Sequence, residues 1–369
     1  MMDATPPLAA ERFPAARWRA PAAGLGAALL FGLSTPFATL LLPHCDPLTL
    51  AAMLYLGAGA GLFLFEACAR MFAPPDPPRE AGLARADLPA MAGVVVFGGV
   101  LGPILMLTGL QHLSAVAGSL LLNLETPFTI LLALAIFGEH LERREALGAA
   151  AIVAGALVLG ARSAGSRALS GDSIGVIAIA AACFFWAIDN NLTQRLSLRD
   201  PVAVTRFKTS AAGGVMLAIA ILRGGAAPRA AVIAAALALG TVSYGLSLIL
   251  NIRALRLHGA ARQAAYFATA PFAGAIAAAL VLGERPGTDT LAAGLLMALG
   301  AATLVTASHA HWHRHEPLAH EHAHVHDQHH AHPHPADVPR AVAHSHWHRH
   351  EPLAHAHPHS SDAHHRHGH

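Results

Sequence analysis

The stretch NLETPF at residues 123–128 decides the fold, because a close counterpart, FATAPF, occurs at residues 267–272. Each stretch leads through an apolar run to a Gly-Glu pair, at 138–139 in the first case and at 283–284 in the second. Repetition at a fixed offset indicates that the chain is built from two related units, and such a repeat constrains the whole fold. The sequence therefore predicts two structurally similar halves.

The apolar segments around these motifs are long enough to cross a membrane. A bilayer core about 30 Å thick requires roughly 20 mostly apolar residues in a spanning helix. Ten stretches meet this requirement, at 22–42, 48–69, 88–110, 114–137, 144–161, 174–196, 201–222, 229–251, 260–282 and 288–307. Their hydrophobicity does not alternate with period two, which disfavours a transmembrane barrel. We predict an all-α membrane protein with ten transmembrane helices.

The two halves are expected to be inverted relative to each other. An Asp-Pro pair at 46–47 opens the second span and another at 200–201 opens the seventh, so each half has five helices. An odd number forces the second half to enter the membrane in the opposite sense. Inverted repeats allow a central site to face either side, which favours a transporter. The expected domains are a disordered N-terminus, two five-helix repeats and a disordered tail, at 1–19, 20–162, 172–307 and 308–369.

Composition disfavours the soluble classes of protein. Hydrophobic residues make up 54% of the chain and charged residues only 12%, against about 25% charged in soluble domains. A net charge of +2 gives no basic surface for nucleic acid. The three cysteines cannot form a disulfide framework, and no nucleotide-binding motif is present. We expect neither an enzyme nor a nucleic-acid binder, and no cofactor for transport.

Positive charge in the loops predicts the orientation. With a cytoplasmic N-terminus, thirteen Lys and Arg residues fall on the cytoplasmic side and five on the other. Cytoplasmic loops normally carry the excess. Both termini are therefore expected in the cytoplasm, with the protein in the inner (plasma) membrane.

These motifs resemble those of the EamA-type carriers in the drug/metabolite transporter superfamily. The resemblance rests on the two Pro-Phe and Gly-Glu motifs and on the 5+5 organisation, and it covers residues 22–307. It implies secondary transport of small metabolites, often export, without a bound cofactor. Many such carriers have an arginine in the second helix, where this chain has Leu54-Tyr55-Leu56; Arg206 in the seventh helix is a candidate for the corresponding role.

The candidate substrate and ion pathway is centred on Glu125, near the middle of the span 114–137. A carboxylate at that depth is costly and marks a functional site by default. Glu125 is a candidate proton carrier; the alternative is a hydrogen-bonded carboxyl that locks the two halves together. The full set of expected pathway residues is Glu125, Asn123, Pro127, Pro271, Asp189, Asn190, Trp186, Arg206, Tyr244 and Tyr266.

The other members of this set have structural as well as functional interpretations. Pro127 and Pro271 occupy matching places, and broken helices at corresponding positions of two halves point to a central site; ordinary packing kinks are the alternative. Asp189 and Arg206 are expected to pair as a gate or a substrate clamp, unless Arg206 and Lys208 simply extend to the interface. The two tyrosines line the cavity or pack.

The histidines are concentrated in the tail. Of 27 histidines, 23 lie from 309 to 369, and the decapeptide HWHRHEPLAH at 311–320 recurs at 346–355. Such low-complexity sequence predicts disorder, while imidazoles suit zinc, nickel, copper and cobalt. The expected metal ligands are His311, His313, His315, His320, His322, His324, His326, His346, His348 and His350. Alternatively, the tail gains charge on acidification and attracts anionic lipids, or repeat expansion left it without a role.

Three functional hypotheses follow. The first is a secondary transporter, with export favoured, that moves a small organic metabolite by alternating access, coupled to protons or by facilitated diffusion. The second is transition-metal efflux or metal-regulated transport. The third is a non-transporting metal-storage or signalling membrane protein. The expected partners are the lipid bilayer and a small-molecule substrate, without nucleic acid, and a homodimer is left open.

Overall fold

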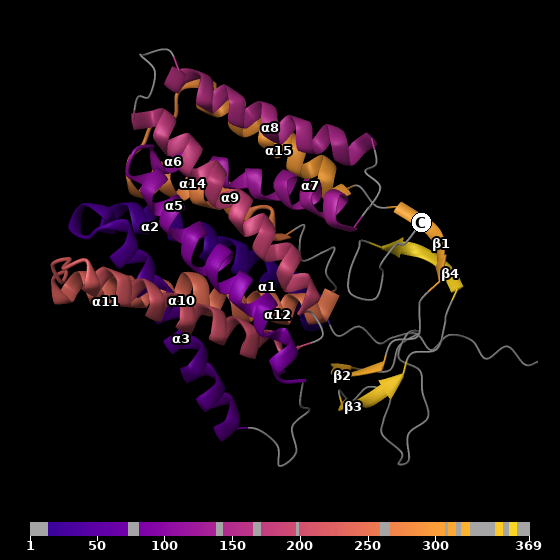
Figure 1. Cartoon of the computed structure of the whole chain (residues 1–369). Coiled ribbons are helices and arrows are strands. Elements are labelled where there is room, and N and C mark those ends of the chain that lie inside the picture. Colours follow the sequence, from indigo (N-terminus) through magenta and orange to yellow (C-terminus); the bar gives the residue numbers. More distant parts are fainter. Residues whose placement is uncertain are drawn as a thin grey trace, which may run out of the picture.

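The computed structural model describes residues 14–72, 81–137, 143–164, 171–196, 199–258 and 266–306, together with four tail segments. Its body is a bundle of helices (Figure 1). The first repeat contains α1 (Pro14–Gly32), α2 (Ser34–Leu41), η1 (Leu42–His44), α3 (Pro47–Met71), η2 (Arg85–Asp87), α4 (Leu88–Gly93), η3 (Val94–Leu101), α5 (Gly102–Leu110), α6 (Ala115–Leu121), η4 (Leu122–Leu124), α7 (Glu125–Phe137) and α8 (Arg143–Ala164). The second contains α9 (Gly171–Arg195), α10 (Pro201–Leu222), α11 (Ala230–Leu239), η5 (Gly240–Leu246), α12 (Ser247–His258), α14 (Ala270–Val281) and α15 (Thr288–Thr306).

Eight helical segments in the described part of the chain are long and apolar enough to cross a membrane. They correspond to the first eight predicted spans. The predicted ninth and tenth spans contain the shorter apolar helices Ala270–Val281 and Thr288–Leu304; residues 259–265, at the start of the ninth, lie outside the described residues. For the described residues of the body, up to residue 306, the prediction of an all-α, multi-pass membrane protein is confirmed.

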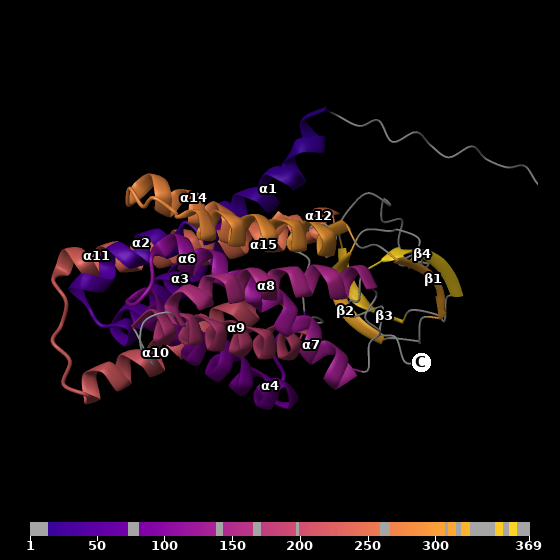
Figure 2. The ribbon, with the colours of Figure 1, turned by 90° about the horizontal axis from the view of Figure 1, so that it is seen from above.

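The helices pair across the two repeats in a two-fold pattern. Spans two and seven pack together as α3 with α10, four and nine as α6 with α14, and five and ten as α8 with α15. The first span contacts the eighth through α1 and α12, while the third contacts the sixth through α5 and α9. If the two repeats are exchanged, the pairs 2–7, 4–9 and 5–10 remain the same, and the pair 1–8 becomes the pair 3–6. Figure 2 shows α8 and α15 side by side.

Small residues allow α8 and α15 to pack closely. A Cβ on Gly148 of α8 would lie 2.9 Å from the carbonyl oxygen of Gly300, and one on Gly300 of α15 would lie 2.6 Å from that of Gly148. The two helix backbones therefore touch at a reciprocal pair of glycines. Small residues commonly serve this purpose in membrane bundles.

The Asp-Pro pairs begin α3 and α10 in the same way. Asp46 accepts a 3.1 Å hydrogen bond from the amide of Thr49, and Asp200 accepts a 2.9 Å bond from the amide of Val202. An aspartate at the N-cap satisfies an otherwise free backbone donor, and the following proline suits the first helical position.

The third and eighth spans share a further irregularity. Each contains a π-helical segment, η3 in the third and η5 in the eighth, between two α-helical parts. π segments within helices are rare and frequently occur at functional sites. Their occurrence at matching places in the two repeats indicates that the symmetry extends to local backbone geometry.

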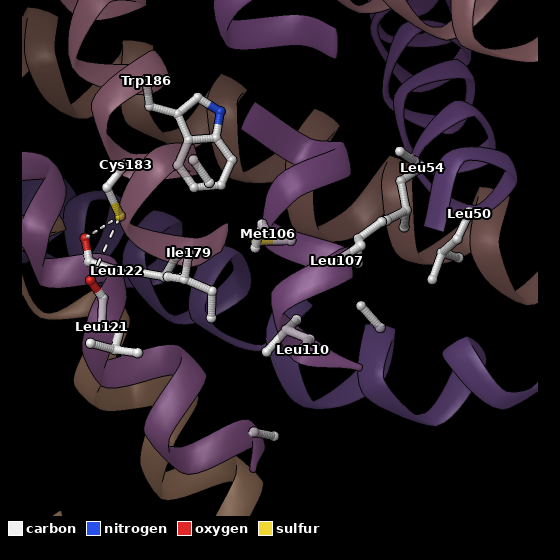
Figure 3. Packing of buried hydrophobic residues seen from close by; sticks show 14 of the residues in the cluster. Leu50, Leu54, Met106, Leu107, Leu110, Leu121, Leu122, Ile179, Cys183 and Trp186 are labelled. Carbon is white, nitrogen blue, oxygen red and sulfur yellow. Dashed lines mark hydrogen bonds between the residues drawn. The ribbon is translucent and has the colours of Figure 1, made fainter. Parts of the chain in front are cut away.

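The core lies where α3, α5, α6 and α9 meet (Figure 3). Met106 and Leu107 of α5 are almost fully buried, as are Leu54 of α3 and Ile179 of α9. Cys183 is also buried and directs its thiol toward the carbonyl oxygens at the end of α6 and the start of η4, at 3.6 and 3.8 Å. This apolar packing holds α9 against the interrupted fourth span.

Four short segments of the tail form strands; the rest of the predicted disordered tail lies outside the described residues. The strands are β1 (His309–Arg314), β2 (Ala319–His324), β3 (His344–Arg349) and β4 (Ala354–His359). β1 pairs with β4 and β2 pairs with β3, both antiparallel (Figure 1). The physical reason lies in the alternation of histidine with other residues, because a period of two is the side-chain period of a strand.

Candidate substrate and ion pathway

A carbonyl in the π-helical segment η3 connects three spans. The carbonyl oxygen of Gly98 accepts a 2.9 Å hydrogen bond from the Tyr55 hydroxyl and a 3.1 Å bond from the Trp186 indole N–H. Tyr55 belongs to α3 and Trp186 to α9, and both side chains are buried. One backbone group therefore fixes two aromatic side chains from different helices beside the third span.

Asp189 and Lys208 form an ion pair next to this carbonyl. Asp189 lies one turn after Trp186 on α9, and its carboxylate contacts the Lys208 ammonium from α10. The Asp189 side chain is 6% exposed and that of Lys208 is 20% exposed. A Cβ on Gly98 would overlap the Asp189 carboxyl group. Glycine at position 98 is therefore what allows α9 to bring this carboxylate close to η3.

Arg206 pairs with a different carboxylate from the one predicted. The sequence suggested an Asp189–Arg206 pair, but Arg206 contacts Glu66 of α3 and lies with its guanidinium carbon 5.0 Å from the centre of the Phe63 ring. The expected pair is wrong because residues two apart on a helix lie about 200° apart around its axis. Lys208 therefore meets α9, whereas Arg206 meets α3.

Glu125 is held by neutral hydrogen-bonding groups. The Asn190 side-chain amide donates a 2.7 Å hydrogen bond to Glu125 Oε1 and lies 3.4 Å from the Thr129 hydroxyl. Glu125 is half-buried, and Asn190 is exposed. Asp189 and Lys208 lie within electrostatic range of the Glu125 carboxyl. Four of the predicted residues therefore lie close together: Glu125 at the start of α7, and Trp186, Asp189 and Asn190 on α9.

The fourth span is interrupted at this carboxylate. α6 ends at Leu121, the 3₁₀ turn η4 follows, and α7 begins at Glu125, so that Pro127 is the third residue of the new helix. Asn123 lies in the turn, where its side chain donates a 2.8 Å bond to the Leu120 carbonyl. Pro271 occupies the equivalent place as the second residue of α14. Proline suits the first turn of a helix because it lacks the amide that would be unpaired there.

The two predicted tyrosines lie at different places. Tyr244 belongs to η5, and its ring centre lies 5.8 Å from that of Tyr55 and 5.6 Å from that of Phe31. It therefore extends the aromatic side of the site into the second repeat. Tyr266 is helical and lies just before the turn at 268–269 that precedes α14, and its carbonyl accepts a 2.6 Å bond from the Thr269 hydroxyl.

Sequence reasoning missed several residues that the structure places at the site. Tyr55, Glu66, Gly98 and Thr129 were not among the predicted pathway residues, and Lys208 was named only as a residue that could extend to the interface. A usable signal was the presence of two cations in the apolar span 201–222 together with carboxylates in neighbouring spans. Cations within a membrane span are normally paired.

The predicted metal ligands belong to the tail. Where side chains are described, no group of three or more His, Cys, Asp or Glu residues could hold a metal ion. Positions 315, 326 and 350 lie outside the described residues, while the other seven predicted ligands lie in the strands β1, β2 and β3.

Comparison with known proteins agrees with this architecture. The EamA-like transporter family matches residues 18–161 and 173–306. An uncharacterized transporter of Methanothermobacter thermautotrophicus is 32% identical over 290 residues, which cover 74% of this chain and 82% of that protein. A solved crystal structure has the same fold with a TM-score of 0.55 and 21% identity, and the match covers 76% of this chain and 95% of the other. The chain therefore belongs to the EamA-like transporter family.

Proposed function

We propose that this protein is a secondary transporter that exports a small organic metabolite by alternating access. The observation that carries the proposal is the two-fold pairing of the helices together with the matched interruptions of the fourth and ninth spans. Symmetry-related helices in opposite orientations can exchange conformations, and this exchange exposes a central site to either side in turn. A polar cluster next to the interruption in the fourth span provides groups that can bind a substrate.

We further propose that Glu125 exchanges a proton during the cycle. A carboxylate in the membrane is costly unless a proton or a partner neutralises it. Glu125 is held by the neutral amide of Asn190, while the neighbouring Asp189 is paired with Lys208. A proton or a substrate cation that binds Glu125 would therefore not have to displace a protein cation.

Transport by the purified protein in liposomes tests this proposal. An untargeted comparison of metabolites exported from cells with and without the protein first identifies a substrate. Glu125→Gln is then expected to abolish the dependence of flux on a pH gradient while the protein keeps its fold. Asp289→Asn, in the first turn of α15, is the matched control and should leave the pH dependence unchanged. An unaltered response in Glu125→Gln would contradict proton exchange.

The orientation in the inner membrane is part of the proposal. It is supported by the excess of thirteen Lys and Arg residues over five in the loops. Two reporters are fused in turn after residue 369, one that is active only in the cytoplasm and one that matures only outside it. Only the cytoplasmic reporter is expected to be active. Activity of a reporter that matures outside the cytoplasm would reverse the assignment of the two sides.

A second candidate function, metal-regulated transport, is favoured by the tail. Twelve histidines occupy paired positions in the four strands β1, β2, β3 and β4, and imidazole is a common ligand of divalent transition metals. Deletion of residues 309–369 should then change metal tolerance or the metal dependence of flux and leave basal metabolite flux intact. If metal tolerance and metal-dependent flux are both unchanged, this second function is contradicted.

A further inference from the structure

The pairing of the tail strands places histidine opposite histidine at every second position. In the β1–β4 ladder, His309 faces His359, His311 faces His357 and His313 faces His355. The intervening pairs contain a histidine on neither side. Because alternate residues of a strand line the same face, six histidines share one face of this ladder.

The β2–β3 ladder repeats the arrangement. Three histidine pairs occur here, His320 with His348, His322 with His346 and His324 with His344. The pairs between them again contain no histidine. The two ladders also continue a single antiparallel register, since the two residue numbers of a pair add up to the same value in both. The strands therefore form the two ends of one interrupted hairpin.

The hairpin folds the two copies of the decapeptide onto each other. β1 and β2 contain most of the first copy, at 311–320, and β3 and β4 contain most of the second, at 346–355. Each ladder joins a strand from one copy to a strand from the other. Of the twelve paired histidines, six lie within the two copies and six lie directly beside them.

The spacing within each ladder suits a tetrahedral ion. Directly opposed residues of an antiparallel pair have Cβ atoms about 4.5–5.5 Å apart, and neighbouring pairs on one face lie roughly 6.8 Å apart along the strand. Four imidazoles from two neighbouring pairs make up the ligand number of a zinc-type site, with metal–nitrogen distances of about 2.0–2.1 Å. Each ladder has three such pairs and can therefore supply one four-histidine site.

We propose that β1–β4 and β2–β3 each form a binding site for one divalent transition-metal ion, so that a single chain holds two. This inference rests on the proposed metal binding by the tail and specifies its ligands and stoichiometry. Each site takes its four ligands from the six paired histidines of its ladder, whereas the other eleven histidines of the tail are not required. Because every site takes ligands from both strands of its ladder, metal binding closes the hairpin within one chain.

Zinc titration of the purified full-length protein tests the stoichiometry. Two equivalents are expected to bind tightly, and cobalt in place of zinc should give the absorption of a tetrahedral ion. Replacement of His355, His357 and His359 by threonine, a good strand former, should remove one equivalent. The matched control replaces His330, His332 and His334, which have the same spacing outside the ladders, and should retain both. An equal loss in the two triple variants would show that only the number of histidines matters and would overturn the proposal.

The register is tested without metal by cross-linking. In a chain with Cys45, Cys68 and Cys183 replaced by serine, the variant H311C with H357C should form an intramolecular disulfide, because opposed strand residues have suitable spacing. The variant H311C with H348C joins positions from different ladders and should cross-link much less. Equal cross-linking of both variants would overturn the register. Neither test measures flux, so the metal sites and the proposed transport can fail independently.

Discussion

Glu284 accepts a 2.8 Å hydrogen bond at Oε1 from the backbone amide of Ala115, 169 residues earlier in the chain. Its second oxygen accepts a 2.9 Å bond from the next amide, that of Val116. Gly283, with a φ of +67°, makes the left-handed turn that follows α14 and precedes Glu284. The Gly-Glu motif of the second repeat therefore satisfies two free amides at the start of α6 and ties the two repeats together at this end of the bundle.

Removal of this carboxylate should weaken the contact between the repeats. We expect Glu284→Ala to lower the free energy of unfolding by about 1–3 kcal/mol, because two amides lose a charged acceptor. Glu284→Gln keeps one acceptor oxygen and should have a smaller effect. Unfolding of the purified protein in mixed detergent micelles measures both. Equal stabilities of the wild type and Glu284→Ala would contradict the capping role.

The Asp189–Lys208 pair should behave as a unit. Lys208→Met leaves the Asp189 carboxylate buried without its cation, a change that costs roughly 3–5 kcal/mol for a buried pair. The double variant Asp189→Asn with Lys208→Met removes both charges and should recover much of this loss. A double-mutant cycle on thermal unfolding measures the coupling. Additive effects of the two single changes would show that the ion pair contributes nothing.

Gly98 should be intolerant of any side chain. In Gly98→Ala the new methyl group would overlap the Asp189 carboxyl group, so the variant should lose transport activity and stability. Gly214→Ala in α10 is the control, because a Cβ there meets nothing within 4 Å and alanine favours a helix by roughly 0.5–1 kcal/mol over glycine. Transport flux and thermal unfolding are measured for both variants. An active and stable Gly98→Ala protein would contradict the close contact between position 98 and Asp189.

The thiol of Cys45 should react slowly at neutral pH. Burial in the turn before α3, with a contribution from the Asp46 charge, raises the pKa of Cys45 to about 11. Because the thiolate is the nucleophile, and its fraction falls as the pKa rises, alkylation should accelerate about tenfold per pH unit between roughly pH 7 and pH 10. Mass spectrometry of a Cys68→Ser, Cys183→Ser variant follows the reaction. A rate that stops increasing near pH 9 would indicate an ordinary thiol.

Sequence pattern was sufficient for the helices and for the repeat, because both depend on apolar length and on local motifs. The Asp-Pro pairs at 46–47 and 200–201 begin helices as their chemistry requires, and the helix breaks lie just before Pro127 and Pro271. These features are encoded by neighbouring residues. They therefore do not depend on how the helices are packed.

The side-chain partners could not be predicted in the same way. Whether Arg206 or Lys208 meets Asp189 depends on the rotation of α10 between α3 and α9, which hydrophobicity within an apolar span does not specify. The contact of Glu284 with α6 likewise depends on the packing of distant helices. The strand pairing in the tail follows the two-residue period of its histidines, and composition alone does not specify which segments pair.

The pairing of both α10 cations with carboxylates has an electrical consequence. Moving one elementary charge through a membrane potential of 100 mV involves about 2.3 kcal/mol. Lys208 with Asp189 is neutral as a pair, whereas Glu66 is shared between Arg206 and Arg70. A motion that carries Lys208 and Asp189 together therefore moves no net charge of that pair across the field. In the proposed transport cycle, the work done by the voltage would then depend on the charge of Glu125 and on what Glu125 binds. A protonated and an ionised Glu125 would give cycles with different voltage sensitivity.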